Sequence, residues 1–187
     1  LIVNSIDAIE AIASYEGVGN ITINNNIIKN LSYTGIDLYN YYNGGVATSN
    51  NYITNNKIEN LLDVINVQKY EIGILIYNNF YADISNNVIS GVRIGVQTGN
   101  FSNSNPGSTQ SISNNNIQSR RRGIFKNLSY NNAGTFTIAN NVLTTAMGST
   151  TNIGLSLSSI GGTVSTIINN NNIDGAYAGV DFWNCTT

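Results

Sequence analysis

Residues 112–117 read ISNNNI, a segment rich in asparagine between two isoleucines, and near-copies of it recur along the chain. The shared pattern is aliphatic, any residue, Asn, Asn, any residue, aliphatic. Six segments fit it, and they begin at Ile23, Ile53, Ile84, Ile112, Ile138 and Ile168. Their starts are 30, 31, 28, 26 and 30 residues apart. This spacing indicates a repeat protein, because a fixed period of about 20–50 residues is typical of solenoids and related arrays.

A second element follows each asparagine pair and reads Gly, aliphatic, any residue and then usually an apolar residue. It occurs as GIDL, GILI, GVQT, GIFK, GLSL and GVDF, beginning at Gly35, Gly73, Gly95, Gly123, Gly154 and Gly179. The two elements keep the same order six times. A low-complexity asparagine-rich tract would not hold such a register, so we expect each repeat to be one structural unit of short strands.

The asparagine pair is predicted to be a corner between two of these strands. Residues two apart in a strand share a face, so Ile53 and Asn55 would point the same way. Ile58 lies an odd number of residues beyond Asn55, so the alternation must break if Ile58 also points inward. Asparagine tolerates the left-handed backbone conformation that such a corner requires.

Stacking the repeats would bury the apolar side chains that a single repeat leaves exposed. Strands of successive coils would pair at about 4.8 Å. The last aliphatic residues of the motifs would then form one inward column, made of Ile28, Ile58, Ile89, Ile117, Leu143 and Ile173. We also expect an asparagine column with Asn55, Asn86 and Asn114 in one file, each amide bonded to its equivalents above and below. Such a ladder is satisfied only when the register does not slip, so it specifies the register.

These two motifs, GIxL and IxNNxI, resemble those of right-handed parallel β-helix proteins of the pectate-lyase-like superfamily, over about residues 20–184. Asn-rich secreted bacterial surface proteins are the most similar kind. The resemblance implies an all-β fold, a right-handed parallel β-helix (solenoid) of about six to seven coils with an asparagine ladder. We expect a single domain over residues 1–187, as a fragment of a longer chain, because Leu1 begins within the pattern. Leucine-rich repeats are the alternative, but their LxxLxL core is missing.

Composition argues against several classes of function. The net charge of −2 gives no nucleic-acid footprint, and no apolar run approaches the roughly 20 residues that span a bilayer. The chain has no histidine, which removes the usual general base and the commonest metal ligand. Its one cysteine, Cys185, excludes an internal disulfide framework and a cysteine-based zinc cluster. We therefore expect no cofactor, no metal site and no membrane insertion.

The outer face of the GIxL strands is where enzymes of the resembling superfamily carry their active sites. Its outward column is predicted to be Asp37, Leu75, Gln97, Phe125, Ser156 and Asp181. The two aspartates would lie five coils apart, roughly 24 Å at strand spacing. That separation is too large for the paired carboxylates of a glycoside hydrolase, so no catalytic residue is predicted.

Two arginines are candidate ligand-binding residues. Arg93 and Arg121 each lie two residues before a repeat glycine, so they would occupy adjacent coils, with Glu71 one coil beyond. One interpretation is a groove for an acidic polysaccharide, since lyases of resembling fold can use arginine as a base. The other is a surface pair between Glu71 and Arg93, worth about 0.2–1 kcal/mol, with solvated arginines beside it. Lys29 and Glu59, at equivalent places in successive coils, are also expected to pair.

Aromatic residues form a second group of candidate ligand-binding residues. Those that follow a repeat glycine by four or two positions are Tyr39, Tyr77, Trp183 and Phe125. Further rings are expected in the loops that follow, at Tyr41, Tyr42, Phe80 and Tyr81. Exposed rings beside asparagine amides suit sugar binding, because the ring offers an apolar face and the amide both donates and accepts. The alternative is that the rings pack onto the sheet.

Three functional hypotheses remain open from the sequence. The first is a non-catalytic solenoid module of a secreted or cell-surface bacterial protein, adhesive or structural, that binds a polysaccharide or cell-surface glycan. The second is a fragment of a polysaccharide lyase, hydrolase or epimerase that uses Arg93, Arg121 and an unidentified acid. The third is end-to-end or edge self-association, because uncapped solenoid ends expose strand edges that can pair.

Overall fold

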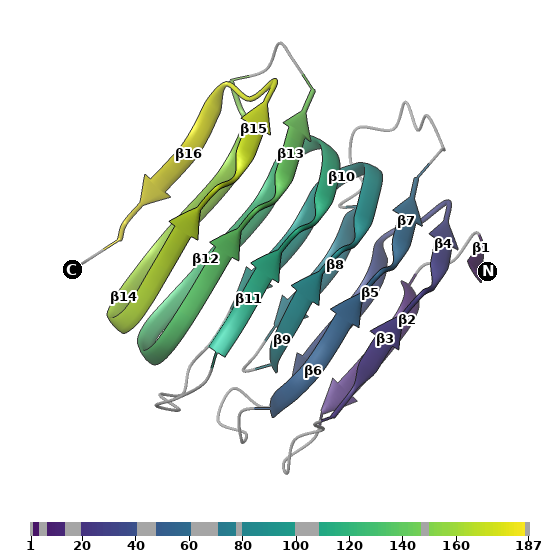
Figure 1. Ribbon diagram of the computed structural model, residues 1–187, viewed down its shortest axis with the longest axis horizontal. Coiled ribbons are helices and arrows are strands. Elements are labelled where there is room, and N and C mark those ends of the chain that lie inside the picture. The colour runs from purple at the N-terminus through teal and green to yellow at the C-terminus, as the bar shows by residue number, and fades with distance from the viewer. Residues whose placement is uncertain are drawn as a thin grey trace.

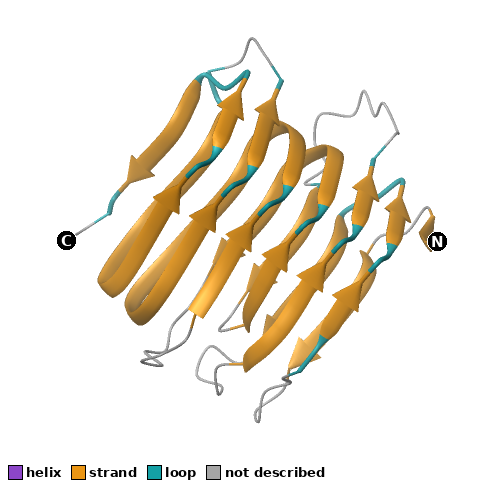
Figure 2. Ribbon diagram, in the orientation of Figure 1, coloured by secondary structure: helices purple, strands orange, loops and turns teal. Residues whose placement is uncertain are grey.

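A computed structural model describes residues 2–3, 7–13, 20–40, 48–60, 71–77, 80–99, 109–146 and 150–185. Within these ranges, side chains are described everywhere except at 2–13, 40, 48–49, 128–134 and 159–164. The described residues contain strands and short connections and no helix (Figure 2). Figure 1 shows the strands lying side by side across the molecule, with the N- and C-termini at opposite ends.

Successive repeats pair into one sheet that runs along three faces of the solenoid. The short face follows the asparagine pairs and holds β1 (Ile2–Val3), β4 (Ile27–Lys29), β7 (Lys57–Glu59), β13 (Val142–Thr145) and β15 (Asn172–Asp174). The long face carries the GIxL strands and holds β2 (Asp7–Ala13), β5 (Thr34–Asn40), β8 (Ile72–Tyr77) and β16 (Ala178–Trp183). The return face leads to the next asparagine pair and holds β3 (Thr22–Asn24), β6 (Thr48–Thr54), β9 (Phe80–Ser85) and β11 (Thr109–Ser113). Three strands turn from one face into the next, β10 (Val88–Gly99), β12 (Asn116–Ala139) and β14 (Ile153–Asn169).

Equivalent residues of successive repeats lie beside one another along the solenoid axis. The predicted aliphatic column of the short face is in register, in the order Ile28, Ile58, Ile89, Ile117, Leu143 and Ile173. Ile2, which was not part of the prediction, pairs with Ile28 at its start. The strand pairs of the long and return faces are also parallel. The fold class predicted from the sequence, an all-β parallel solenoid, is therefore confirmed.

The number of turns is smaller than the sequence analysis predicted. The described residues amount to about four turns of solenoid, against the predicted six to seven coils. Parts of several coils, among them residues 41–47, 61–70 and 100–108, lie outside the described residues. Some residues of the aliphatic column therefore belong to turns that the structure describes only in part.

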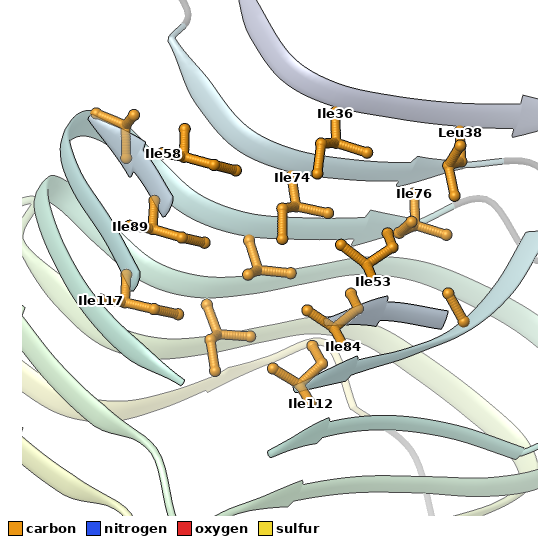
Figure 3. Close-up of a cluster of buried hydrophobic side chains, with 14 of the residues drawn as sticks. Ile36, Leu38, Ile53, Ile58, Ile74, Ile76, Ile84, Ile89, Ile112 and Ile117 are labelled. Carbon is orange, nitrogen blue, oxygen red and sulfur yellow. The ribbon is translucent and has the colours of Figure 1, made fainter. Parts of the chain in front are cut away.

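Inward aliphatic side chains form one hydrophobic cluster along the axis. Figure 3 shows Ile58, Ile89 and Ile117 one above the other on the short face. Ile36 and Ile74 lie likewise on the long face. Each of these five side chains is fully buried, and burying an isoleucine contributes roughly 1.5–3 kcal/mol. The repeat thus gains its core only by stacking, as the alternation of its residues indicates.

A ladder of asparagine side chains runs beside this core. Its rungs are Asn26, Asn56, Asn87, Asn115, Asn141 and Asn171. Asn56 donates from its backbone N–H and from Nδ2 to Oδ1 of Asn87, at 2.9 and 3.0 Å. The Nδ2 group also donates to the carbonyl of Ile23 in the preceding coil, at 2.9 Å. The buried amides are therefore satisfied by their equivalents in neighbouring coils, which fixes the register.

The ladder uses the second asparagine of each pair, so the prediction that Asn55, Asn86 and Asn114 form the bonded column was wrong. The first residues of the pairs have φ between 51° and 58°, namely Asn25, Asn55, Asn86, Asn114, Asn140 and Asn170. Asn55 is exposed and Asn56 is buried. The left-handed residue turns the chain, so the residue after it points inward. The predicted left-handed corner is confirmed. Because the first asparagine of each pair forms this corner, the ladder is made by the second asparagine.

Candidate ligand-binding groove

A hollow of about 360 Å³ on the long face brings several predicted site residues together. Three arginines line it, Arg93, Arg121 and Arg122. Three aromatic residues line it as well, Tyr33, Tyr77 and Phe125, and the remaining lining comes from Ile72, Leu75, Ile94 and Gln97. We call this hollow the arginine groove. Its residues come from four successive coils, so it extends along the solenoid axis by about 14 Å at strand spacing.

A bulge in β12 positions the arginines. Val92 pairs with Ser119 and Ile94 pairs with Arg122, so two residues of β12 face one residue of β10, Arg93. Such an extra residue bends the strand and re-aims side chains, which is why bulges are frequent next to functional sites. Here it allows Arg121 and Arg122 to line the groove while the preceding arginine takes another partner.

That other partner is Glu71, which forms an ion pair with Arg120. The Glu71 side chain is only 1% exposed. The exposed position predicted for Glu71, in a surface pair with Arg93, was therefore wrong, because the carboxylate is buried and pairs with Arg120. The Arg93 backbone N–H donates to the Glu71 carbonyl at 3.0 Å. The carboxylate expected next to the groove is thus paired with an arginine that does not line it.

The three guanidinium groups of the groove share one partly buried region. Arg122 lies over the ring of Phe125, with 4.2 Å from Cζ to the ring centroid, a cation–π geometry. The pKa of Arg122 is lowered, chiefly by burial and further by the positive charges of Arg121 and Arg93, while Asp181 opposes this effect. The Nε atoms of Arg121 and Arg122 are buried without a hydrogen-bond partner among the described residues. A bound anion would relieve the repulsion among these guanidinium groups.

Aromatic rings form the apolar part of the groove. Tyr77 is half-buried, and its Cε2 atom lies 3.1 Å from the place where a Cβ on Gly99 would be. The ring therefore lies against a backbone position that has no side chain. Burial also raises the pKa of Tyr77. Tyr33 is 43% exposed at the edge, so the groove combines positive charge with accessible ring surface.

The predicted site residues do not all gather in this groove. Arg93, Arg121, Tyr77 and Phe125 line it. Tyr39 pairs in register with Tyr77 and lies one coil away from it, outside the lining. Trp183 is four strand steps from Tyr77, through Gly99, Asn127 and Ser158. Four steps correspond to roughly 19 Å, so Trp183 belongs to a different part of the long face.

The outward column predicted for the long face is in register as expected. Asp37, Leu75, Gln97, Phe125, Ser156 and Asp181 pair in this order. The five-step separation of Asp37 and Asp181 is therefore confirmed. Among the residues that the structure describes, no three Asp, Glu or Cys side chains come together as a possible metal site. The same residues include no helix able to cross a membrane.

Other expectations concern residues outside the groove. Phe80 and Tyr81 were expected as exposed loop residues, but they lie in β9 and are 0% and 8% exposed. Both residues belong to a strand and are buried, so the predicted exposed loop position was wrong. Tyr41 and Tyr42 lie outside the described residues. The predicted pair of Lys29 and Glu59 is confirmed, with 3.7 Å between Nζ and Oε2.

Glu59 also has a nearer partner on its own strand. Lys57 lies 2.6 Å from Glu59 through Nζ and Oε1. The hydrogen bond from Lys57 is the main reason that the pKa of Glu59 is lowered. This carboxylate is therefore held on the short face, away from the arginine groove.

The sequence analysis missed two functional candidates, Arg122 and Lys126. Each is a charged residue at a position where the neighbouring coils carry an uncharged one. Arg122 occupies the position that is Ile72, Ile94 and Ile153 in other coils. Lys126 occupies an inward position of the long face, between Thr98 and Leu157, and is 4% exposed. Its Nζ lies 4.2 Å from the centroid of the Phe136 ring. Aligning the repeats by column and looking for the charged exception would have found both residues.

Comparison with known proteins adds no relative to this picture. No family model, curated protein or solved structure matches the chain. The groove is therefore interpreted from its own residues and their geometry.

Proposed function

We propose that this chain is a non-catalytic β-solenoid module of a secreted or cell-surface bacterial protein, and that it binds an acidic polysaccharide in the arginine groove. The observation that carries the proposal is the gathering of Arg93, Arg121 and Arg122 around one hollow. The ion pair of Glu71 with Arg120 supports it, because it keeps a nearby carboxylate from neutralising the groove.

The chemistry of the lining suits a uronate chain. Guanidinium groups bind carboxylates through two parallel hydrogen bonds, which adds direction as well as strength. The rings of Tyr77 and Phe125 offer apolar faces to the faces of sugar rings. Gln97 adds an amide that can both donate to and accept from hydroxyl groups. Because the groove extends over four coils, it favours several linked sugars over a single one.

The resemblance to the pectate-lyase-like superfamily belongs to this proposal. It rests on the GIxL and IxNNxI motifs, which recur through the solenoid. It makes polymeric uronates the first probes to use. The placement outside the cell rests on the resemblance to Asn-rich secreted surface proteins, and a fold alone does not carry a function.

Isothermal titration with polygalacturonate and alginate, at low ionic strength, tests the proposal. Dextran of similar length serves as the neutral control. We expect both uronate polymers to bind and dextran not to bind. Arg121→Ala and Arg93→Ala should each weaken binding about tenfold or more, equivalent to about 1.4 kcal/mol. Added salt should weaken binding further, because exposed charges are screened.

Lys57→Ala is the matched control, since it removes one positive charge from the short face, where the Lys57 side chain is 50% exposed. It should leave uronate binding unchanged, as should Trp183→Ala. Equal binding of dextran, or equal loss in Arg121→Ala and Lys57→Ala, would contradict the groove as the binding site. Absence of binding to either uronate would contradict the proposed ligand class.

A polysaccharide lyase is the second candidate, and one observation favours it. The pKa of Arg122 is lowered by burial and by its neighbouring arginines. A lowered pKa favours the neutral guanidine form, which is the form that can accept a proton as a general base. The same polymers can be followed by ultraviolet absorbance for new unsaturated ends. Product formation that is lost in Arg122→Lys and in Arg121→Ala would replace the non-catalytic proposal with a lyase.

A further inference from the structure

The arginine groove has a charged end and an uncharged end along the solenoid axis. Its lining residues from the first two of its coils are Tyr33, Ile72, Leu75 and Tyr77. The three arginines of the lining all come from the next two coils, because Ile94 pairs with Ile72 on one side and with Arg122 on the other. Among the lining residues that the structure describes, the first two coils thus supply no charged side chain. The positive charge is confined to one strand step of about 4.8 Å.

The uncharged end presents apolar surface that a ligand can reach. Leu75 and Tyr77 are half-buried, and Tyr33 is 43% exposed. Ile72 adds a buried aliphatic side chain to the lining. Burial raises the pKa of Tyr77, so its hydroxyl group stays uncharged at neutral pH. This end of the groove therefore favours an apolar part of a ligand, because contact removes apolar surface from water.

The charged end favours a carboxylate instead. Arg93 and Arg121 are half-buried, so a ligand can reach them in surroundings that are partly shielded from water. The attraction between a guanidinium and a carboxylate is stronger there than in bulk water. A carboxylate at the opposite end of the groove would give up water without gaining a guanidinium partner, which costs free energy. The two ends therefore favour different chemical groups on one ligand.

We propose that the arginine groove recognises a uronate linked to a 6-deoxy sugar, with the carboxylate at the arginines and the methyl group of the deoxy sugar against Leu75 and Tyr77. This specificity rests on the proposed function, because it presupposes that an acidic polysaccharide binds in the same groove. A 6-deoxy sugar carries a methyl group where an ordinary hexose carries a hydroxymethyl group. It is therefore neutral, and it is less polar than the hexose or the uronate. A groove that extends over four coils accommodates both linked sugars.

Two matched tetrasaccharides test this specificity by isothermal titration. One alternates glucuronate with L-rhamnose and the other alternates glucuronate with L-mannose, so they differ only in the hydroxyl group at C6 of the neutral sugar. Both carry the same number of carboxylates. We expect the rhamnose compound to bind about tenfold tighter, because an apolar site discriminates between such groups by at least about this factor. Added salt should weaken both compounds equally and leave the ratio of their affinities unchanged, since only the shared carboxylates are screened.

Leu75→Asn tests where the methyl group binds. Leu75 is half-buried, and its neighbours in register are Asp37 and Gln97, so a polar side chain is compatible with this position. The variant should bind both tetrasaccharides through the arginines but lose the preference for the rhamnose compound. Val88→Asn is the matched control, since it makes the same kind of change at a position that is 43% exposed on the short face. It should keep the wild-type affinities and preference. Circular dichroism establishes that both variants remain folded.

Arg121→Ala completes the set, because it should weaken both tetrasaccharides by the same factor and leave their ratio unchanged. A changed ratio in this variant contradicts the placement of the methyl group away from the arginines. Equal affinity of the wild type for the two tetrasaccharides overturns the specificity and leaves acidic-polysaccharide binding in place. So does binding of polygalacturonate without either tetrasaccharide. A preference that persists in Leu75→Asn, or that Val88→Asn removes as well, also overturns it. Absence of binding to the tetrasaccharides, polygalacturonate and alginate alike overturns the proposed function too.

Discussion

Replacing Lys126 by methionine should remove a pH dependence of stability that the wild-type solenoid shows above neutrality. Lys126 is 4% exposed inside the solenoid and lies against the Phe136 ring. Burial lowers the pKa of Lys126 from the ordinary 10.5 to about 7, because removing an ammonium group from water disfavours its charged form. In the unfolded chain the same lysine keeps its ordinary pKa.

The sign of the effect follows from proton uptake. Between pH 7 and 10.5 the unfolded chain binds a proton at Lys126 that the folded chain does not bind. The free energy of unfolding therefore rises with pH in this window, by up to about 1.4 kcal/mol per pH unit. The whole gap between the two pKa values corresponds to about 5 kcal/mol as an upper limit. Below pH 7 both states are protonated and the cost of burial is fully present.

Urea unfolding followed by circular dichroism, from pH 6 to 9.5, measures this slope. The wild-type midpoint should rise steadily above pH 7. Lys126→Met should give a flat profile in that range and a higher midpoint at pH 6, because the buried charge is replaced by an apolar chain of similar length. Lys57→Met is the control, since Lys57 is exposed and lowers the pKa of Glu59. A lowered carboxylate pKa adds stability that is present at neutral pH and lost as the pH falls through it, so this variant should lower the midpoint evenly from pH 6 to 9.5 and keep the rise above pH 7. A flat wild-type profile, or a slope that persists in Lys126→Met, would refute the reasoning.

Two further predictions concern the ladder and the repeat glycine. Asn87→Ala leaves the Asn56 amide groups and the Ile53 carbonyl without their partners, and each buried group left unsatisfied costs about 1–3 kcal/mol. We expect urea unfolding to show a loss of at least about 3 kcal/mol, whereas Asn86→Gly, at φ 57°, should be close to neutral. Gly95→Ala should destabilise by several kcal/mol or prevent folding, because its Cβ would lie 2.6 Å from the Gly123 carbonyl oxygen and closer still to Ile117. Gly179→Ala, with nothing within 4 Å, should leave the thermal midpoint unchanged, and equal effects in the two glycine variants would contradict the stacking of these positions.

The repeat spacing and the alternation of residues were sufficient to predict the fold. Ile58 and its equivalents form the expected column because strand periodicity and the repeat length fix which residues meet. The choice between Asn55 and Asn56 for the ladder was not predicted correctly, since it depends on which residue of the pair adopts the left-handed conformation. Parity of the flanking residues shows that a corner exists but not which asparagine makes it.

The groove was only partly predictable, because its side chains are placed by a local irregularity. Arg93 and Arg121 were identified from their distance to a repeat glycine. The bulge in β12 was not visible in that spacing, so the pairing of Arg120 with Glu71 and the entry of Arg122 into the groove were missed. Trp183 shares its offset from a repeat glycine with Tyr77, but four strand steps separate the two residues, so the shared offset does not bring the rings together. Position within a repeat is therefore predictable here, whereas the combination of side chains across coils requires the structure.

Distances along the solenoid axis test the central claim, that equivalent residues of successive repeats stack in register. Spin labels at Ile27→Cys and Asn172→Cys, in a Cys185→Ser background, occupy exposed positions joined by five strand steps. Double electron–electron resonance should give one distance distribution centred at roughly 24 Å, broadened by the label linkers, and moving the second label to Val142→Cys should shorten it by about 4.8 Å. Several separate distances, or a centre that does not shorten with the move to position 142, would contradict a stacked solenoid.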